Sequence, residues 1–213
     1  MNRDLLMEIY HRLYSAFGPQ HWWPGDGPVE VMVGAVLTQN TNWANVEKAI
    51  SNLKQARCLD LASLNRISVD ELAVLIRPSG YYNVKARRLK ALVEFICREF
   101  SCRVEDMEKV ETYKLRERLL GISGLGPETV DSILLYALGR PIFVVDAYTK
   151  RIFSRHRLCF EDVDYQELQC QIMSSLDPDV GLFNEYHALL VRLGKEYCRK
   201  TNPNCLGCPL NGL

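Results

Sequence analysis

The sequence has no apolar run long enough for a membrane span. Its longest apolar stretch, 29–37, is interrupted by Glu30 and is far shorter than the roughly 18–20 residues that a spanning helix needs. The N-terminus is polar from Asn2 to Asp4 and leads into a mixed helical pattern, so no signal peptide with an apolar core is expected. These absences predict a cytoplasmic protein that has no contact with a membrane.

The formal net charge is zero, because there are 26 Lys and Arg residues and 26 Asp and Glu residues. A nucleic-acid role would therefore have to depend on a local basic face. Val, Ile and Thr nowhere alternate with polar residues for long enough to predict a sheet, and there is no repeat or Gly/Ser linker. With 47% apolar and 24% charged residues among 213, the composition is typical of a globular protein with a real core.

Helical periodicity covers most of the chain. Leu6, Ile9, Leu13 and Phe17 recur at three- and four-residue steps, and the pattern stops at Gly18-Pro19. The other segments with this pattern are 28–37, 43–53, 69–76, 84–99, 114–120, 127–139, 147–156, 165–174 and 181–199. The sequence therefore predicts an all-α protein.

The segment 120–130 is the most informative. One helix ends near Leu120, and Gly124 and Gly126 allow a tight hairpin whose backbone can approach another molecule closely. Pro127 then occupies the favoured first position of the next helix. Backbone N–H groups at such a turn suit an anion such as a DNA phosphate. An ordinary helix–turn–helix corner fits the same residues.

Asp146 follows an apolar run and precedes a helix. Aspartate in that position is a preferred N-cap. A capping carboxylate can also act on a substrate, so the two interpretations are compatible.

Together with three further segments, these residues resemble the endonuclease III family of helix-hairpin-helix DNA glycosylases. The matching segments occur in order at 37–41, 80–86, 121–129, 145–146 and 198–210. The resemblance implies an all-α, two-lobed fold with a C-terminal iron–sulfur loop. It places a six-helix lobe with the hairpin at 27–135, and a second lobe at 1–26 plus 136–213.

The resemblance also implies how the protein binds double-stranded damaged DNA as a nucleoid-associated monomer. Gln39 would fill the gap left by a flipped nucleotide, a loop around Tyr81 would wedge into the base stack, and Asp146 would be the catalytic aspartate. The expected DNA contacts are Gln39, Asn40, Tyr81, Asn83, Lys85, Gly124, Gly126, Thr129 and Lys150.

The sequence departs from the family at one chemically decisive position. Members that also cleave the strand carry a lysine in the second hairpin helix, where its amine attacks the sugar C1′ and forms a Schiff base. Glu128 stands there instead, and neither Lys85 nor Lys150 falls at that position. A monofunctional glycosylase is therefore expected, a hydrolase of N-glycosidic bonds without lyase activity.

The tryptophans indicate which kind of damaged base the protein accepts. The expected base pocket consists of Trp22, Trp23, Pro24, Trp43 and Glu128. Electron-rich indoles attract a cationic, alkylated purine by about 1–2 kcal/mol per good contact. Such a base leaves readily, so Asp146 alone could stabilise the oxocarbenium-like sugar and orient the water. The alternative is that these tryptophans are core residues and do not line a base pocket. The pattern resembles the 3-methyladenine branch of the family.

Three of the eight cysteines lie close together at the end of the sequence. Without a secretory signal, a metal or cluster site is favoured over a disulfide scaffold. Cys198, Cys205 and Cys208 match three ligands of the family's [4Fe–4S] loop, whose fourth ligand would fall at position 214, after the last residue of this sequence. An upstream cysteine as the fourth ligand, zinc in place of iron, or no cluster are the alternatives.

Two further functions remain open at this point. One is a glycosylase for another lesion or mismatch, with or without lyase activity, since pocket shape decides the base. The other is a DNA-binding module without catalysis, which the presence of Asp146 disfavours.

Overall fold

The computed structural model describes all 213 residues as two compact units without a β-strand. The first unit combines Met1–Trp23 with Arg140–Leu213, and the second is Pro24–Gly139. The boundaries expected after residues 26 and 135 lie a few residues away from these. None of the helices combines the length and the hydropathy that crossing a bilayer requires.

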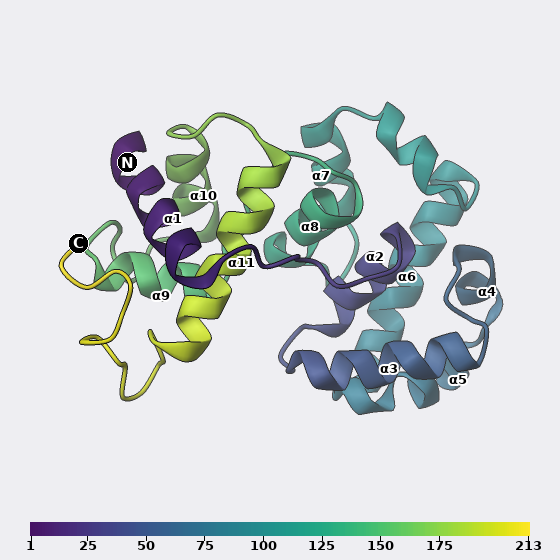
Figure 1. Cartoon of the computed structure of the whole chain (residues 1–213). Helices are drawn as coiled ribbons and strands as arrows, with labels where there is room; N and C mark the ends of the chain where they lie inside the picture. Colours follow the sequence, from purple (N-terminus) through teal and green to yellow (C-terminus); the bar gives the residue numbers. More distant parts are fainter. The chain divides into compact units, whose positions relative to one another are not determined.

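The first unit is built around its longest helix. Its helices are α1 (Arg3–Phe17), α9 (Ala147–Arg155), α10 (Tyr165–Met173) and α11 (Val180–Glu196). α1 and α9 pack against α11, so the two ends of the chain share one core (Figure 1). The buried Tyr186 hydroxyl donates a 2.7 Å hydrogen bond to the Leu6 carbonyl. Gly194 allows α9 to approach α11, because a Cβ there would lie 2.3 Å from the Tyr148 ring.

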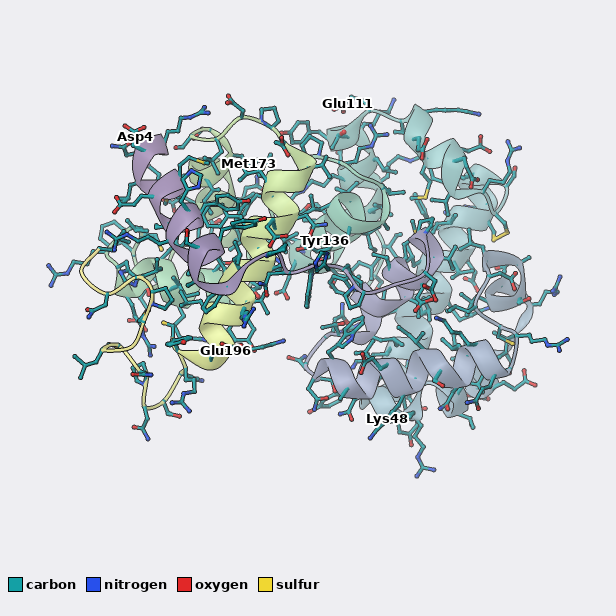
Figure 2. All side chains as sticks on the ribbon, viewed as in Figure 1. Asp4, Lys48, Glu111, Tyr136, Met173 and Glu196 are labelled. Carbon is teal, nitrogen blue, oxygen red and sulfur yellow. A yellow bond between two sulfur atoms is a disulfide. The ribbon has the colours of Figure 1, made fainter.

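The second unit is built around an almost wholly apolar helix, α2 (Pro28–Leu37), whose residues from Glu30 onward are all buried. α3, α6, α8 and the π-helical turn η3 surround it. The other elements of this unit are α3 (Trp43–Gln55), α4 (Leu61–Arg66), α5 (Val69–Leu75), η1 (Arg77–Ser79), α6 (Tyr82–Phe100), η2 (Val104–Lys109), α7 (Thr112–Leu120), α8 (Pro127–Ser132) and η3 (Ile133–Ala137). Lys48 lies on the exposed face of α3 (Figure 2).

The structure confirms the all-α prediction and corrects two segments. α4 was not predicted, because its six residues are too few to show a helical period. Its start is set by Asp60, whose carboxylate accepts a hydrogen bond from the Ser63 backbone N–H. The expected helix 127–139 is instead a short α-helix that ends at Ser132 and continues as the π-helical turn.

One local disulfide joins Cys97 to Cys102, and the other six cysteines are free. α6 ends at Phe100, and both Ser101 and Cys102 adopt positive φ angles, which turns the chain back toward the helix. Neither Cys97 nor Cys102 belongs to the three cysteines that lie close together at the end of the sequence. Their pairing depends on that reversal of the chain and not on a conspicuous spacing.

Candidate active site

Asp146 caps the helix that follows it, as its position in the sequence predicted. It comes after a buried apolar stretch and is itself only 8% exposed. Its Oδ1 accepts hydrogen bonds from the backbone N–H and the hydroxyl of Thr149, at 2.7 and 2.9 Å. The cap holds the carboxylate through Oδ1, so its second oxygen, Oδ2, can face another group.

His187 faces that second oxygen. This buried residue of α11 places its Nε2 3.6 Å from Asp146 Oδ2. Burial acts to raise the pKa of Asp146, but His187 and the two Thr149 donors outweigh it and hold that pKa below its ordinary value. The carboxylate therefore stays ionised in mild acid. Sequence reasoning missed His187, because no motif relates it to a residue 41 positions earlier.

Trp22 and Trp23, the last two residues of the N-terminal segment of the first unit, have their rings in contact. Their rings are 5.3 Å apart in an edge-to-face arrangement, and both are half-buried. Lys195 Nζ lies 5.9 Å from the centre of the Trp22 ring. Trp22 thus already has a cation near its ring, which the sequence did not predict.

The other three predicted pocket residues belong to the second unit. Pro24 is exposed, and Trp43 begins α3, where its indole N–H donates to Glu47 at 2.9 Å. Glu128 is exposed in the first turn of α8.

The structure brings Gln39 together with the hairpin. Gln39 Nε2 donates to Thr129 Oγ1 at 2.9 Å and to the Gly124 carbonyl at 3.4 Å. Its Oε1 accepts a short hydrogen bond from Arg88, a residue of α6. Two segments that the sequence singled out separately therefore form one network, which Arg88 joins from α6.

The hairpin has the geometry that its glycines predicted. Gly124 adopts a φ of +87°, a conformation that side chains disfavour. Gly126 precedes Pro127, and Pro127 begins α8. Gly124 and Gly126 are exposed, whereas Thr129 is buried. The hairpin backbone is thus accessible, whereas the Thr129 side chain is buried and binds Gln39.

The expected wedge segment presents its side chains to solvent. Tyr81 is 73% exposed and takes a left-handed backbone conformation just before α6. Asn40 and Asn83 are exposed as well. These positions are compatible with the expected contacts.

The two lysines expected to contact DNA both donate to backbone carbonyls, and the burial of Lys85 contradicts its predicted role. Lys85 is 1% exposed, and its ammonium donates to the carbonyls of Leu37 and Ser79 at 2.8 and 2.6 Å. It is a structural residue, because the helical period points it inward onto carbonyls that need a donor. Lys150 is half-buried, and its ammonium donates to the Val163 carbonyl at 2.9 Å.

The three C-terminal cysteines line one cavity of about 140 Å³ in the first unit. Cys198 is buried, Cys208 is half-buried and Cys205 is exposed. Burial raises the pKa of the Cys208 thiol, and the neighbouring Cys198 and Cys205 raise it further. No set of three potential ligands converges on a point where it could hold a single metal ion. A cubane cluster makes a different demand, because each thiolate binds a different iron.

Two arginines of α9 hold the backbone around these cysteines. Arg151 donates to the Cys198 carbonyl at 2.7 Å, and Arg155 donates to the Arg199 carbonyl at 2.7 Å. Arg155 also donates to Cys198 Sγ at 3.4 Å. The cysteine loop is thereby attached to the helix that Asp146 begins.

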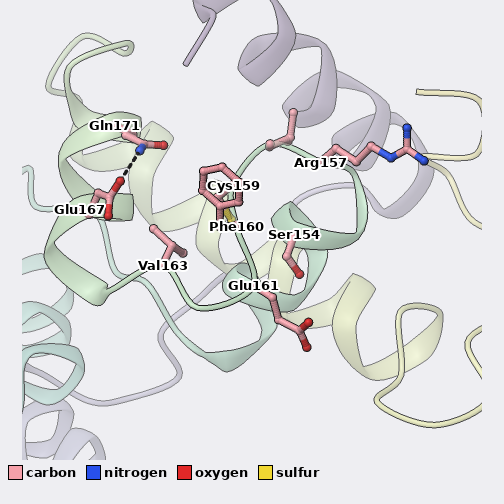
Figure 3. A pocket seen from close by; sticks show the side chains of 9 residues that line it. Ser154, Arg157, Cys159, Phe160, Glu161, Val163, Glu167 and Gln171 are labelled. Atoms are coloured by element: carbon pink, nitrogen blue, oxygen red, sulfur yellow. Dashed lines mark hydrogen bonds between the residues drawn. The ribbon is translucent and has the colours of Figure 1, made fainter.

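A separate cavity of about 420 Å³ lies on the first unit, between α9, α10 and the loop that joins them (Figure 3). Phe160 is 82% exposed beside it, and Gln171 donates to Glu167 at 3.2 Å across one side. None of the predicted site residues lines this cavity.

Comparisons with known proteins place this geometry in a family. Residues 33–178 match the profile of the HhH-GPD superfamily base excision DNA repair protein. The chain is 46% identical over 209 residues to the Methanocaldococcus jannaschii protein named "Putative DNA repair glycosylase MJ1434", covering 97% of this chain and 94% of that protein. It is 27% identical to endonuclease III of Thermotoga maritima, covering 96% and 89% of the two chains.

Solved structures agree with the sequence comparisons. The H. pylori 3-methyladenine DNA glycosylase MagIII, bound to 1,N6-ethenoadenine, has a TM-score of 0.74 and 32% identity over 92% of this chain and 98% of its own. A non-covalent endonuclease III–DNA complex reaches a TM-score of 0.82 at 20% identity, covering 98% and 93%, and shows the shared fold. The chain therefore belongs to the HhH-GPD superfamily of base excision DNA repair proteins, as an endonuclease III-like DNA glycosylase.

Proposed function

We propose that this glycosylase is monofunctional and hydrolyses the N-glycosidic bond of an alkylated purine, such as 3-methyladenine, in double-stranded DNA. It would act as a monomer. The observation that carries the proposal is the fixed carboxylate of Asp146, together with Glu128 at the position where a lyase needs an amine.

Asp146 is suited to stabilise positive charge. The Thr149 bonds and the low pKa keep its carboxylate ionised and fixed before substrate arrives. Because the glycosidic bond breaks through an oxocarbenium-like sugar, a preorganised negative charge lowers the barrier. The same carboxylate can orient the attacking water.

The chemistry of the leaving group and the presence of Trp22 and Trp23 support the choice of an alkylated purine. A purine that already carries positive charge leaves as a neutral base and needs no second acid. The paired indoles offer a stacking surface for it. The solved 3-methyladenine glycosylase at 32% identity supports this choice.

A neutral modified purine is the second candidate, and Lys195 favours it. An ammonium 5.9 Å from the centre of the Trp22 ring repels a cationic base stacked there, but not a neutral one. The similar H. pylori enzyme holds 1,N6-ethenoadenine, a base of the neutral kind, in its structure.

A base-release assay separates these possibilities. Duplexes containing 3-methyladenine, 7-methylguanine, 1,N6-ethenoadenine or a thymine mismatch are incubated with the protein, and the free bases are quantified by mass spectrometry. Release of 3-methyladenine supports the proposal, whereas release of ethenoadenine alone supports the second candidate. Binding without release of any base would contradict both.

His187 should set the acid side of the pH–rate profile. Replacing it by glutamine keeps a hydrogen-bond donor but removes the charge influence of the imidazole, which helps to hold the pKa of Asp146 down. The pKa should therefore rise, and the acid limb of kcat/KM should move to higher pH. His11→Gln, which removes an exposed imidazole on α1, serves as the control. An unchanged acid limb in His187→Gln would show that His187 does not act on Asp146.

We also propose that the cysteine loop holds a [4Fe–4S] cluster, with Cys198, Cys205 and Cys208 as three of its ligands. Their shared cavity and the arginine-braced loop support this proposal. The cluster would tie down a C-terminal segment that buries little apolar surface, Leu210 being a buried exception. The loop would then hold α9 in place through Arg151 and Arg155.

Purification under anaerobic conditions tests the cluster. A chain carrying a cysteine at position 214 should be brown, with an absorbance band at about 400 nm and about four irons per chain. The same chain with Cys205→Ala should lose the band and unfold at a lower temperature. Colourless protein with one zinc per chain, or with no metal, would contradict the proposal.

A further inference from the structure

Two cations on one turn of α6 hold the Gln39 segment, one through its backbone and the other through a side chain. Lys85 and Arg88 are three residues apart, so both face the same side of the helix. Lys85 binds the backbone carbonyl of Leu37, the last residue of α2, while Arg88 binds the side chain of Gln39. Backbone and side chain of the same segment are thus fixed by one helix.

The same two cations also reach the other DNA-facing segments. Lys85 donates to the carbonyl of Ser79, two residues before the exposed Tyr81. Arg88 packs directly over Gly124 of the hairpin, where a Cβ would lie 2.6 Å from its side chain. Lys85 and Arg88 together, called the clamp below, therefore link the segments 37–39, 79–81 and 124–129 within one unit.

The hydrogen bonds fix the orientation of the Gln39 amide. Arginine is only a donor, so it holds the carbonyl oxygen of the amide. The amide nitrogen donates to Thr129 Oγ1 and to the Gly124 carbonyl. Three partners from α6 and the hairpin region leave this side chain little rotational freedom.

We propose that Arg88 is a positioning residue that holds Gln39 in place for the gap left by a flipped nucleotide. This inference builds on the proposed function. A side chain ordered before DNA binds loses no rotamer entropy at the binding step, so preorganisation strengthens binding to the distorted duplex. The alternative role for Arg88 is direct contact with a phosphate, which would strengthen binding to any duplex, whether damaged or intact.

A double-mutant cycle separates the two roles. Binding is measured to a duplex with a tetrahydrofuran abasic-site analogue and to the matching intact duplex, for Gln39→Ala, Arg88→Met and the double variant. If Arg88 acts through Gln39, each single variant should weaken binding to the abasic duplex by about tenfold, and the double variant should be no weaker than either. Binding to the intact duplex should change much less with Gln39→Ala.

Matched controls exclude simple charge and folding effects. Arg87→Met removes the same charge from an exposed position on the same helix, and its effect should add to that of Gln39→Ala. Thr129→Val removes a Gln39 partner without changing charge, and its effect should not add. Thermal unfolding verifies that each variant is folded, and Arg88→Ala takes the place of Arg88→Met in the cycle if that variant is not folded.

Additive effects of Arg88→Met and Gln39→Ala, with a salt dependence reduced by about one phosphate contact, would overturn the proposal. This result is distinct from failure of the proposed function. The binding cycle uses an abasic duplex and requires no base release, so it decides the role of Arg88 even if no damaged base is hydrolysed.

Discussion

Replacing Asp146 by asparagine is expected to lower the rate of base release by roughly 10²-fold or more while DNA binding is retained. The substitution removes the negative charge that would face the developing positive sugar. Asparagine is as good an N-cap as aspartate, so its Oδ1 can still accept the Thr149 bonds and α9 should keep its start. The defect should therefore be chemical and not structural.

Single-turnover release from a methylated duplex measures this effect, and anisotropy on an abasic-analogue duplex measures binding. Asp164→Asn is the matched control, because Asp164 caps α10 through Glu167 in the same way and is exposed. It should release base at nearly the normal rate. Near-normal turnover by Asp146→Asn would remove Asp146 from the catalytic role.

Borohydride added during turnover should trap no covalent protein–DNA adduct. Schiff-base formation needs an unprotonated amine within reach of C1′. At the matching position the carboxylate of Glu128 can form no imine, and nearby phosphates would repel it. Product strands should stay intact until alkali or an abasic-site nuclease is added.

The structure also disfavours Lys150 and Lys85, neither of which stands at the family position, as the attacking amine. The Lys150 ammonium is engaged by the Val163 carbonyl. Burial and the nearby charge of Arg88 lower the pKa of Lys85 to about 8, but its ammonium is enclosed and bound to two carbonyls. A low pKa makes an amine nucleophilic only where substrate can reach it.

A designed gain of activity makes the borohydride test stronger. Glu128→Lys should yield some trapped adduct, because it restores an amine at the family position, on an exposed first turn of α8. Glu128→Gln removes the charge without adding an amine and should trap nothing. An adduct formed by the unmodified protein would refute monofunctionality and indicate Lys150 or the N-terminal amine as the nucleophile.

The sequence by itself determined the helical class and the local features of the site. Gly18 and Pro127 mark one helix end and one helix start as expected, and Asp146 caps α9 as its position indicated. Gly124 adopts the positive φ that a tight hairpin requires. These features depend on residues within a few positions of one another, which is the range over which capping, turn chemistry and periodicity act.

Only the tertiary structure decided which residues meet. The pairing of His187 with Asp146 results from the packing of α9 on α11, and the clamp on Gln39 results from the packing of α6 against α2 and the hairpin. Lys85 resembled a phosphate ligand in the sequence, because charge indicates a solvated side chain until packing shows that it is buried. Partners separated by some 40 to 90 positions leave no trace in local periodicity, so their contacts follow from how the helices pack.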